Sequence, residues 1–145
     1  MPRVLCVGKR NTARSPMMAA LLKKELGGDC PVESAGIQKE AAGQNVDVHA
    51  IVCMRECDID LSGHRSRWID SLNITSFTHI VCTDEAAAEY VVLSLVGYQM
   101  IEIILANENS GGIPLPRGAG LTEYRECVAL LERTLPAIAR QIRYG

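Results

Sequence analysis

The stretch Val4–Leu22, VLCVGKRNTARSPMMAALL, decides the fold of this chain. Val4–Val7 is an apolar run of strand length, and the polar loop that begins at Gly8 extends to Ser15. Ser15 followed by Pro16 predicts a helix start, because a capping hydroxyl stands directly before a proline at the first helical position. The apolar residues that follow recur at helical spacing. The stretch therefore predicts a strand, a polar loop and a helix in succession.

The rest of the chain repeats this alternation of strands and helices. Further strands are expected at Val32–Ala35, His79–Thr83 and Met100–Leu105. Helices are expected from Ser15 to Leu26, from Asp47 to Cys57, from Asp84 (as cap) to Leu95, and from Thr122 onward with an apolar stripe of Tyr124, Val128, Leu131, Leu135, Ile138 and Ile142. Pro136 is expected to kink the last helix, and residues 106–120 to form a long loop. The alternation predicts one α/β domain over residues 1–145: a four-stranded parallel sheet with helices on both faces, as in Rossmann-like folds.

Length, composition and charge exclude several classes of protein. The chain has 145 residues, of which 48% are hydrophobic, so it has enough apolar material for a core and is not expected to be disordered. No apolar run approaches the roughly 18 residues of a membrane span. The apolar stretch at the start of the sequence is too short for a signal peptide. A net charge of −2 argues against a dedicated nucleic-acid binder. We expect a soluble, cytoplasmic domain, whose oligomeric state the sequence leaves open.

The six cysteines are scattered along the chain without a CxxC pair. In a cytoplasmic protein they are expected to be reduced thiols rather than a disulfide framework. His49, Cys53 and Cys57 recur at four-residue steps and share one helix face, but no fourth ligand is evident, so packing is favoured over a metal site. The sequence predicts no metal and no cofactor.

The loop after the first strand has the features of an anion site. Its backbone amides can converge on an anion, and the dipole of the helix that follows favours negative charge there. Lys9, Arg10 and Arg14 form the densest basic cluster of the chain. Arg14 has the planar fork that holds a phosphate through two parallel hydrogen bonds. The glycine spacing fits neither a Walker loop nor a GxGxxG fingerprint. An ordinary solvated loop is the alternative interpretation.

Beyond this loop, four later segments complete a resemblance. They are SAGI at Ser34–Ile37, DLSGHRSR at Asp60–Arg67, HIVCTDE from His79, and IPLPRGAGLTEYRECVALLE from Ile113. Together with the opening stretch, and in this order, they resemble the low-molecular-weight protein tyrosine phosphatase family, which has arsenate reductase-like relatives. The resemblance covers essentially the whole chain.

The resemblance implies a chemistry that this chain lacks the groups to perform. Family members attack phosphorus with a cysteine thiolate six residues before the loop arginine, and an aspartate of a later DP motif protonates the leaving oxygen. Here those two positions are Gly8 and Leu115. Cys6 lies two residues earlier, about 6.6 Å away along a strand, and is expected to be a buried thiol. No catalytic residue is therefore intact.

The groups that shape the family's pocket are present. The resemblance implies that Asn11 bonds to Ser15, to Ser34 and to His64, and so supports the loop. Thr12 stands where some members that act on phosphoarginine carry threonine, although a loop-shaping hydroxyl is the simpler interpretation. The arsenate reductases use two later redox cysteines, and Cys82 has no nearby partner for such a reaction.

We predict a phosphatase-like protein without catalysis, a pseudophosphatase. It is expected to bind phosphate, sulfate, or a phosphorylated protein or small molecule through Gly8, Lys9, Arg10, Asn11, Thr12, Ala13, Arg14 and Ser15. Loss of the thiolate removes a like charge, and glycine is expected to leave room for the anion to sit deeper. Trp68 follows in the loop that would border the pocket mouth, where it could stack on an aromatic ligand, although a packing role is favoured. Arg65 and Arg67 beside it could extend a basic rim or simply be solvated. An active phosphatase of atypical mechanism and an interaction scaffold with a vestigial anion site remain open.

Overall fold

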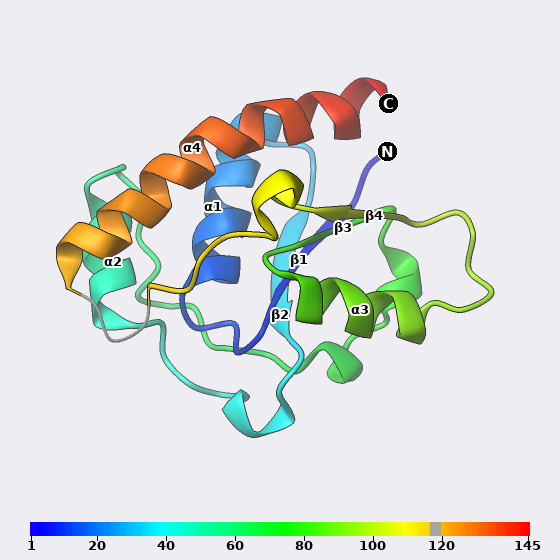
Figure 1. Ribbon diagram of the computed structural model, residues 1–145, viewed down its shortest axis with the longest axis horizontal. Coiled ribbons are helices and arrows are strands. Elements are labelled where there is room, and N and C mark those ends of the chain that lie inside the picture. Colours follow the sequence, from blue (N-terminus) through cyan, green and yellow to red (C-terminus); the bar gives the residue numbers. More distant parts are fainter. Residues whose placement is uncertain (117–119) are drawn as a thin grey trace.

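The computed structural model of the chain describes residues 1–116 and 120–145. Its strands β1 (Val4–Gly8), β2 (Val32–Gly36), β3 (His79–Cys82) and β4 (Glu102–Leu105) form one parallel sheet in the order β2-β1-β3-β4 (Figure 1). This confirms the predicted four-stranded parallel sheet. Since β1 pairs with both β2 and β3, the segment that follows it lies over the middle of the sheet edge, where parallel α/β folds bind ligands.

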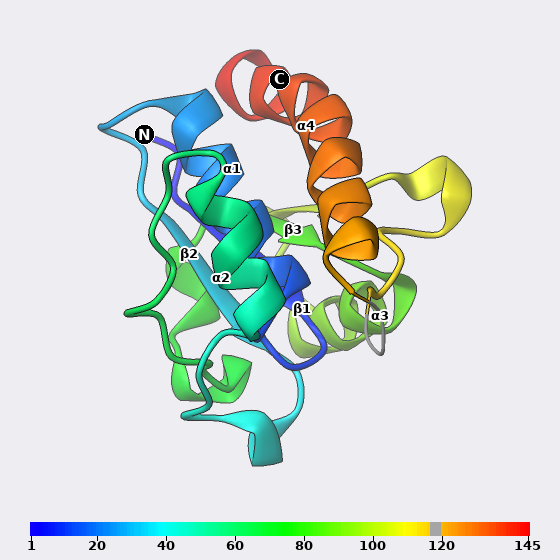
Figure 2. The same cartoon turned by 90° about the vertical axis from the view of Figure 1, so that its left-hand side faces the viewer.

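Four helices cover the sheet: α1 (Arg14–Leu26), α2 (Val48–Arg55), α3 (Glu85–Ser94) and α4 (Leu121–Tyr144). Buried side chains of α1, α2 and α4 form one core cluster on one face of the sheet, and those of α3 belong to a second cluster on the other. The predicted arrangement of helices on both faces is therefore confirmed. Figure 2 shows the amino-terminal ends of α1, α2 and α4 directed toward the same end of the molecule.

The helix boundaries correct one sequence expectation and confirm another. Ser15 does not cap α1, which begins at Arg14 with Ala13 as the capping residue and no capping side chain. Ser15 lies inside the first turn of the helix, and its hydroxyl accepts a hydrogen bond from Asn11 Nδ2. Asp84 does cap α3, because its Oδ1 accepts from the amide of Ala87 at 2.8 Å.

The remaining segments differ from the expectations mostly at their ends. β4 begins at Glu102 rather than Met100, and α2 is shorter at both ends than predicted. α4 continues through Pro136 as one helix, and its six predicted stripe residues are all buried. The expected loop of residues 106–120 contains a short 3-10 turn at Glu108–Ser110. Its residues 117–119 lie outside the described part of the chain.

Cys6 is completely buried in the middle of β1 and faces the cluster formed with α1 and α4. This confirms that it is a core thiol of the strand. In the described part of the chain, no helix combines the length and the apolar character needed to cross a bilayer.

Candidate functional site

The loop between β1 and α1 turns its carbonyl groups outward. Three of them accept hydrogen bonds from backbone amides outside the loop: Gly8 from Ile37 at 3.0 Å, Lys9 from Gln38 at 3.0 Å, and Thr12 from Asp47 at 2.8 Å. Within the part of the chain that the structure describes, no amide of residues 9–15 donates to another protein group. The loop is therefore anchored through its oxygens, and a continuous row of N–H donors remains for a ligand.

The buried side chain of Asn11 stabilises this shape of the loop through three hydrogen bonds. Its side chain is buried, and its backbone is left-handed at φ 64°, a conformation that asparagine tolerates better than most residues. Nδ2 donates to Ser15 Oγ at 2.9 Å, and Oδ1 accepts from His64 Nε2 at 3.1 Å and from the amide of Arg67 at 3.0 Å. Two of the three expected partners are thus present.

The third expected partner, Ser34, is replaced by the amide of Arg67. Ser34 is buried on β2, next to β1, and its carbonyl oxygen accepts from the Arg67 guanidinium at 3.0 Å. In the described part of the chain, Asn11 and Ser34 form no hydrogen bond, so the expected Asn11–Ser34 bond is not present. Ser34 contributes to the site indirectly, by holding Arg67.

Arg14 is buried and already bonded to two protein groups. Its Nη2 forms an ion pair with Asp84 Oδ2 at 2.8 Å, and its Nη1 donates to the carbonyl oxygen of Ile113 at 2.9 Å. The exposed fraction is only 6% for the Arg14 side chain and 23% for that of Asp84. The guanidinium therefore already has a counter-charge, and an anion in the loop must compete with Asp84 for it.

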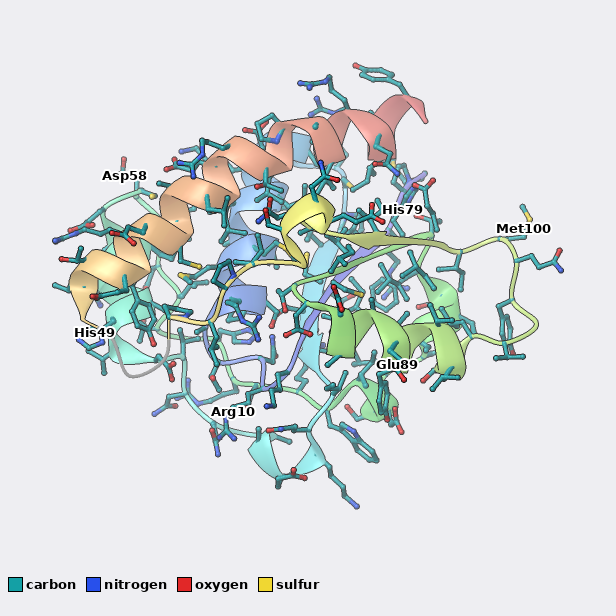
Figure 3. All side chains as sticks on the ribbon, in the orientation of Figure 1. Arg10, His49, Asp58, His79, Glu89 and Met100 are labelled. Carbon is teal, nitrogen blue, oxygen red and sulfur yellow. The ribbon has the colours of Figure 1, made fainter. Side chains whose placement is uncertain are left out.

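Lys9 and Arg10 carry the remaining positive charge of the loop. Both are partly buried, and Arg10 donates to the side-chain oxygens of Gln38 at 3.4 Å and Gln44 at 2.9 Å. Arg10 and His49 are labelled in Figure 3 and both lie in the lower left part of that view. The glutamines are neutral, so they hold the Arg10 side chain without neutralising its positive charge.

The loop opens into a cavity of about 610 Å³. Besides residues 8–15, the cavity is lined by Gln44, Asp47, Val48, His49, Leu115 and Tyr124. Its volume is large enough for a phosphate together with an organic group. On its wall, the Tyr124 hydroxyl donates to Asp47 Oδ2 at 3.1 Å, and the rings of His49 and Tyr124 are 5.2 Å apart. Burial, followed by the Asp47 charge, raises the pKa of Tyr124 to about 12, so the phenol stays neutral.

The space behind Gly8 is more closely packed than the sequence suggested, and Thr83, which helps to close it, lies behind the residues that line the cavity. A Cβ atom at Gly8 would lie 3.1 Å from Ser15 Oγ and 3.2 Å from Thr83 Oγ1. The room expected beside Gly8 is therefore largely taken by these two hydroxyl groups. Thr83 was not among the expected site residues. The available signal was its place at the carboxyl end of the expected strand His79–Thr83, the end at which parallel sheets bind ligands, although the pattern did not show that it lies against Gly8.

Of the alternatives for the segment after His64, the packing role of Trp68 is confirmed, and Arg65 and Arg67 do not extend a basic rim. Trp68 packs against the core cluster on the α3 side of the sheet, with Lys39 Nζ 5.2 Å above its ring, and it does not line the cavity. Arg67 pairs with Glu33 at 3.2 Å, and Arg65 donates to nearby backbone carbonyls. These three side chains are therefore engaged in packing and local bonds rather than in the pocket mouth.

The chain's cysteines are poor nucleophiles in this structure. Burial raises the pKa of each of the six thiols, including Cys82 to about 12 and Cys127 to about 11. Cys53 is buried in the core cluster, whereas His49 is exposed and lines the cavity. The two side chains therefore lie in different surroundings and do not form one binding site. Among the described residues, no group of three or more His, Cys, Asp or Glu side chains is arranged to hold a metal ion.

His64 predicts a pH dependence of stability. Burial, followed by the charge of Arg67, lowers the pKa of His64 below its ordinary value of 6.5. The unfolded chain therefore binds more protons than the folded one below about pH 6.5, and the free energy of unfolding falls as the pH drops through that window. Urea unfolding at several pH values should show this slope. In His64→Gln the slope should be smaller, and an equal slope in both proteins would contradict the assignment.

A parallel α/β sheet with an amide-lined loop between its first strand and first helix has the arrangement in which folds of this class bind anions. The chain belongs to the low molecular weight phosphotyrosine protein phosphatase family, whose sequence model matches residues 3–144. It is 28% identical to a protein-arginine-phosphatase of Geobacillus stearothermophilus over 144 residues, which cover 97% of this chain and 96% of that protein. It is also 44% identical to an arsenate reductase of Oceanobacillus iheyensis, but over 82 residues that cover 55% of each chain.

Solved structures show the same fold. The YwlE arginine phosphatase of Geobacillus stearothermophilus superposes with a TM-score of 0.85 at 28% identity, covering 99% of this chain and 94% of that one. Wzb of Vibrio vulnificus, determined with benzylphosphonate, superposes with a TM-score of 0.84 at 22% identity, covering 97% and 98%. The fold expected from the resemblance is therefore confirmed.

Proposed function

We propose that this chain is a catalytically inactive member of its family that binds phosphate or a phosphorylated protein or small molecule in the loop of residues 8–15. The observation that carries this proposal is the row of amides of residues 9–15, which have no protein acceptor in the described part of the chain. They line a cavity at the start of α1, where the helix dipole also favours an anion.

The absence of catalysis follows from two positions. Gly8 has no side chain to form a covalent phospho-enzyme, and Leu115 lines the cavity with a side chain that has no proton to donate. Cys6 does not substitute for a nucleophile, since it is buried in the core and its pKa is raised by burial. What remains of the family's site is the part that binds.

Related structures support an oxyanion as the ligand. The Wzb protein of Vibrio vulnificus is described in complex with benzylphosphonate, and that of Escherichia coli K30 in complex with sulphate. A mutant of the YwlE arginine phosphatase carries a phosphorylated active-site serine. By analogy, we expect the loop of this chain to take the same tetrahedral group.

The test is a phosphate titration by calorimetry on the wild-type chain and on Arg14→Ala. We expect saturable binding in the wild type and an affinity at least about tenfold lower in the variant, because hydrogen bonds to charged groups contribute about 1.5–3 kcal/mol each. Arg140→Ala serves as the matched control. Arg140 is exposed and lies in the carboxy-terminal half of α4, away from the end of that helix that lines the cavity, so we expect unchanged affinity. Circular dichroism shows whether Arg14→Ala is folded. A wild type that does not bind phosphate would refute the proposal.

A second candidate is a weak phosphatase of atypical mechanism. It is favoured by the presence of Asp47 and His49 in the cavity, since both are groups that exchange protons with a bound water or substrate. Turnover of an aryl phosphate separates the two candidates. A rate above that of the buffer that survives Cys6→Ser and is lost in Arg14→Ala would establish this enzyme and refute the inactive one.

A further inference from the structure

Thr83 is fixed directly beneath the loop. It is the first residue after β3, and its amide donates to the carbonyl oxygen of Val7 on β1 at 2.9 Å. Its own carbonyl oxygen accepts from the amide of Ile113 at 2.7 Å. Both backbone groups are therefore held from opposite sides. The Thr83 side chain is completely buried, and with the backbone fixed it can move only by rotation about its Cα–Cβ bond.

The hydroxyl of Thr83 has no hydrogen-bond partner among the residues that the structure describes. Buried polar groups in folded proteins are almost always paired, because an unpaired donor loses its water without a replacement. The neighbouring buried side chains Asn11, Arg14 and Ser15 each have at least one protein partner. An unpaired hydroxyl at this position therefore points to a group that joins the site when a ligand binds.

This hydroxyl faces Gly8, the position of the missing nucleophile. Thr83 Oγ1 lies 3.2 Å from the point where a Cβ atom of residue 8 would be, and Ser15 Oγ lies 3.1 Å from the same point. Ser15 Oγ accepts from Asn11, which leaves its own proton available for donation. Two neutral O–H donors therefore flank the place where catalytic members of the family carry a thiolate.

We propose, on the basis of the function proposed above, that Thr83 and Ser15 form a hydroxyl floor that binds the innermost oxygen of a phosphate or phosphomonoester. A hydroxyl donates to an anionic oxygen, whereas a thiolate at this place repels it. Gly8 is then part of the binding site, because any side chain there would stand between the floor and the ligand. With glycine at position 8, the anion meets the two neutral hydroxyl donors and no thiolate. This arrangement suits binding a dianion rather than attacking it.

The experiment compares Thr83→Val with Thr83→Ser by calorimetric titration with inorganic phosphate. Valine has the shape of threonine without its hydroxyl, and we expect the affinity to fall about tenfold, which is 1.4 kcal/mol. Serine keeps the hydroxyl, and its affinity should stay within about twofold of the wild type. Without phosphate, Thr83→Val should unfold at the same or a higher urea concentration, because an unpaired buried hydroxyl has been removed.

The outcomes separate this inference from the proposed function. If the wild type does not bind phosphate, the proposed function fails and this inference fails with it. If the wild type binds and Thr83→Val binds equally well, the hydroxyl floor is refuted while the binding function stands. Gly8→Ala adds a methyl group between floor and ligand, so it should also weaken binding, and combining it with Thr83→Val should cause little further loss. Fully additive losses would overturn the inference.

Discussion

Replacing Gly8 by cysteine and Leu115 by aspartate is expected to turn this chain into a phosphatase with thiol-dependent turnover of an aryl phosphate. The amides of residues 9–15 and the start of α1 would lower the pKa of the new thiol, since both favour negative charge. The new aspartate would protonate the leaving oxygen, a step that contributes about 10²- to 10⁴-fold in rate. The measurement is hydrolysis of an aryl phosphate, with and without prior alkylation of the thiol.

The close contacts around residue 8 limit the activity that the double variant can reach. A Cβ atom at residue 8 would meet Ser15 Oγ at 3.1 Å and Thr83 Oγ1 at 3.2 Å, distances at which a neighbour must move. Adding Thr83→Ala removes one of these contacts, so we expect the triple variant to be faster than the double variant. The matched control is Gly8→Ser with Leu115→Asp, which has the same shape but no thiol and should be inactive. Inactivity of both the double and the triple variant, with circular dichroism showing that they are folded, would contradict the expected loop geometry.

The parts of the fold that were predictable depend on local patterns. The four strands follow from short apolar runs, and the Asp84 cap follows from an acceptor placed just before a helix. The boundary of α1 was missed because Ser15 can accept from a helix amide or from Asn11, and the choice depends on how the loop closes. Local sequence does not distinguish the two.

The contacts that were missed all join segments distant in the sequence. Arg14 follows the loop after β1 and Asp84 follows β3, and they meet because β1 and β3 are neighbours in the sheet. Strand order is not encoded in the spacing of apolar residues, so neither this pair nor the position of Thr83 followed from the pattern. The favoured packing role of Trp68 is confirmed, since a large apolar side chain gains more by packing on the core than by standing at a pocket mouth.

The ion pair between Arg14 and Asp84 suggests a second large effect, in which one substitution lowers stability and raises affinity. Asp84→Asn keeps the cap of α3, because an amide oxygen can still accept from Ala87. It removes the counter-charge of Arg14, whose side chain is only 6% exposed. Removing one partner of a buried pair costs about 3–5 kcal/mol, and because Asp84 is 23% exposed we expect a loss at the lower end of this range, about 3 kcal/mol. Urea unfolding without phosphate measures this loss.

Phosphate should reverse much of that loss. Asp84 competes with an anion for Arg14 and also repels it, so we expect Asp84→Asn to bind phosphate at least about tenfold more tightly than the wild type. Because a ligand stabilises the folded state by RT ln(1 + [L]/Kd), the same phosphate concentration should raise the unfolding midpoint more in the variant than in the wild type. Glu85→Gln removes an equal charge from the adjacent, exposed position and should change neither quantity much. If Asp84→Asn loses stability but its phosphate affinity is unchanged, Arg14 supports the fold without holding the ligand, and the anion depends on the loop amides with Lys9 and Arg10.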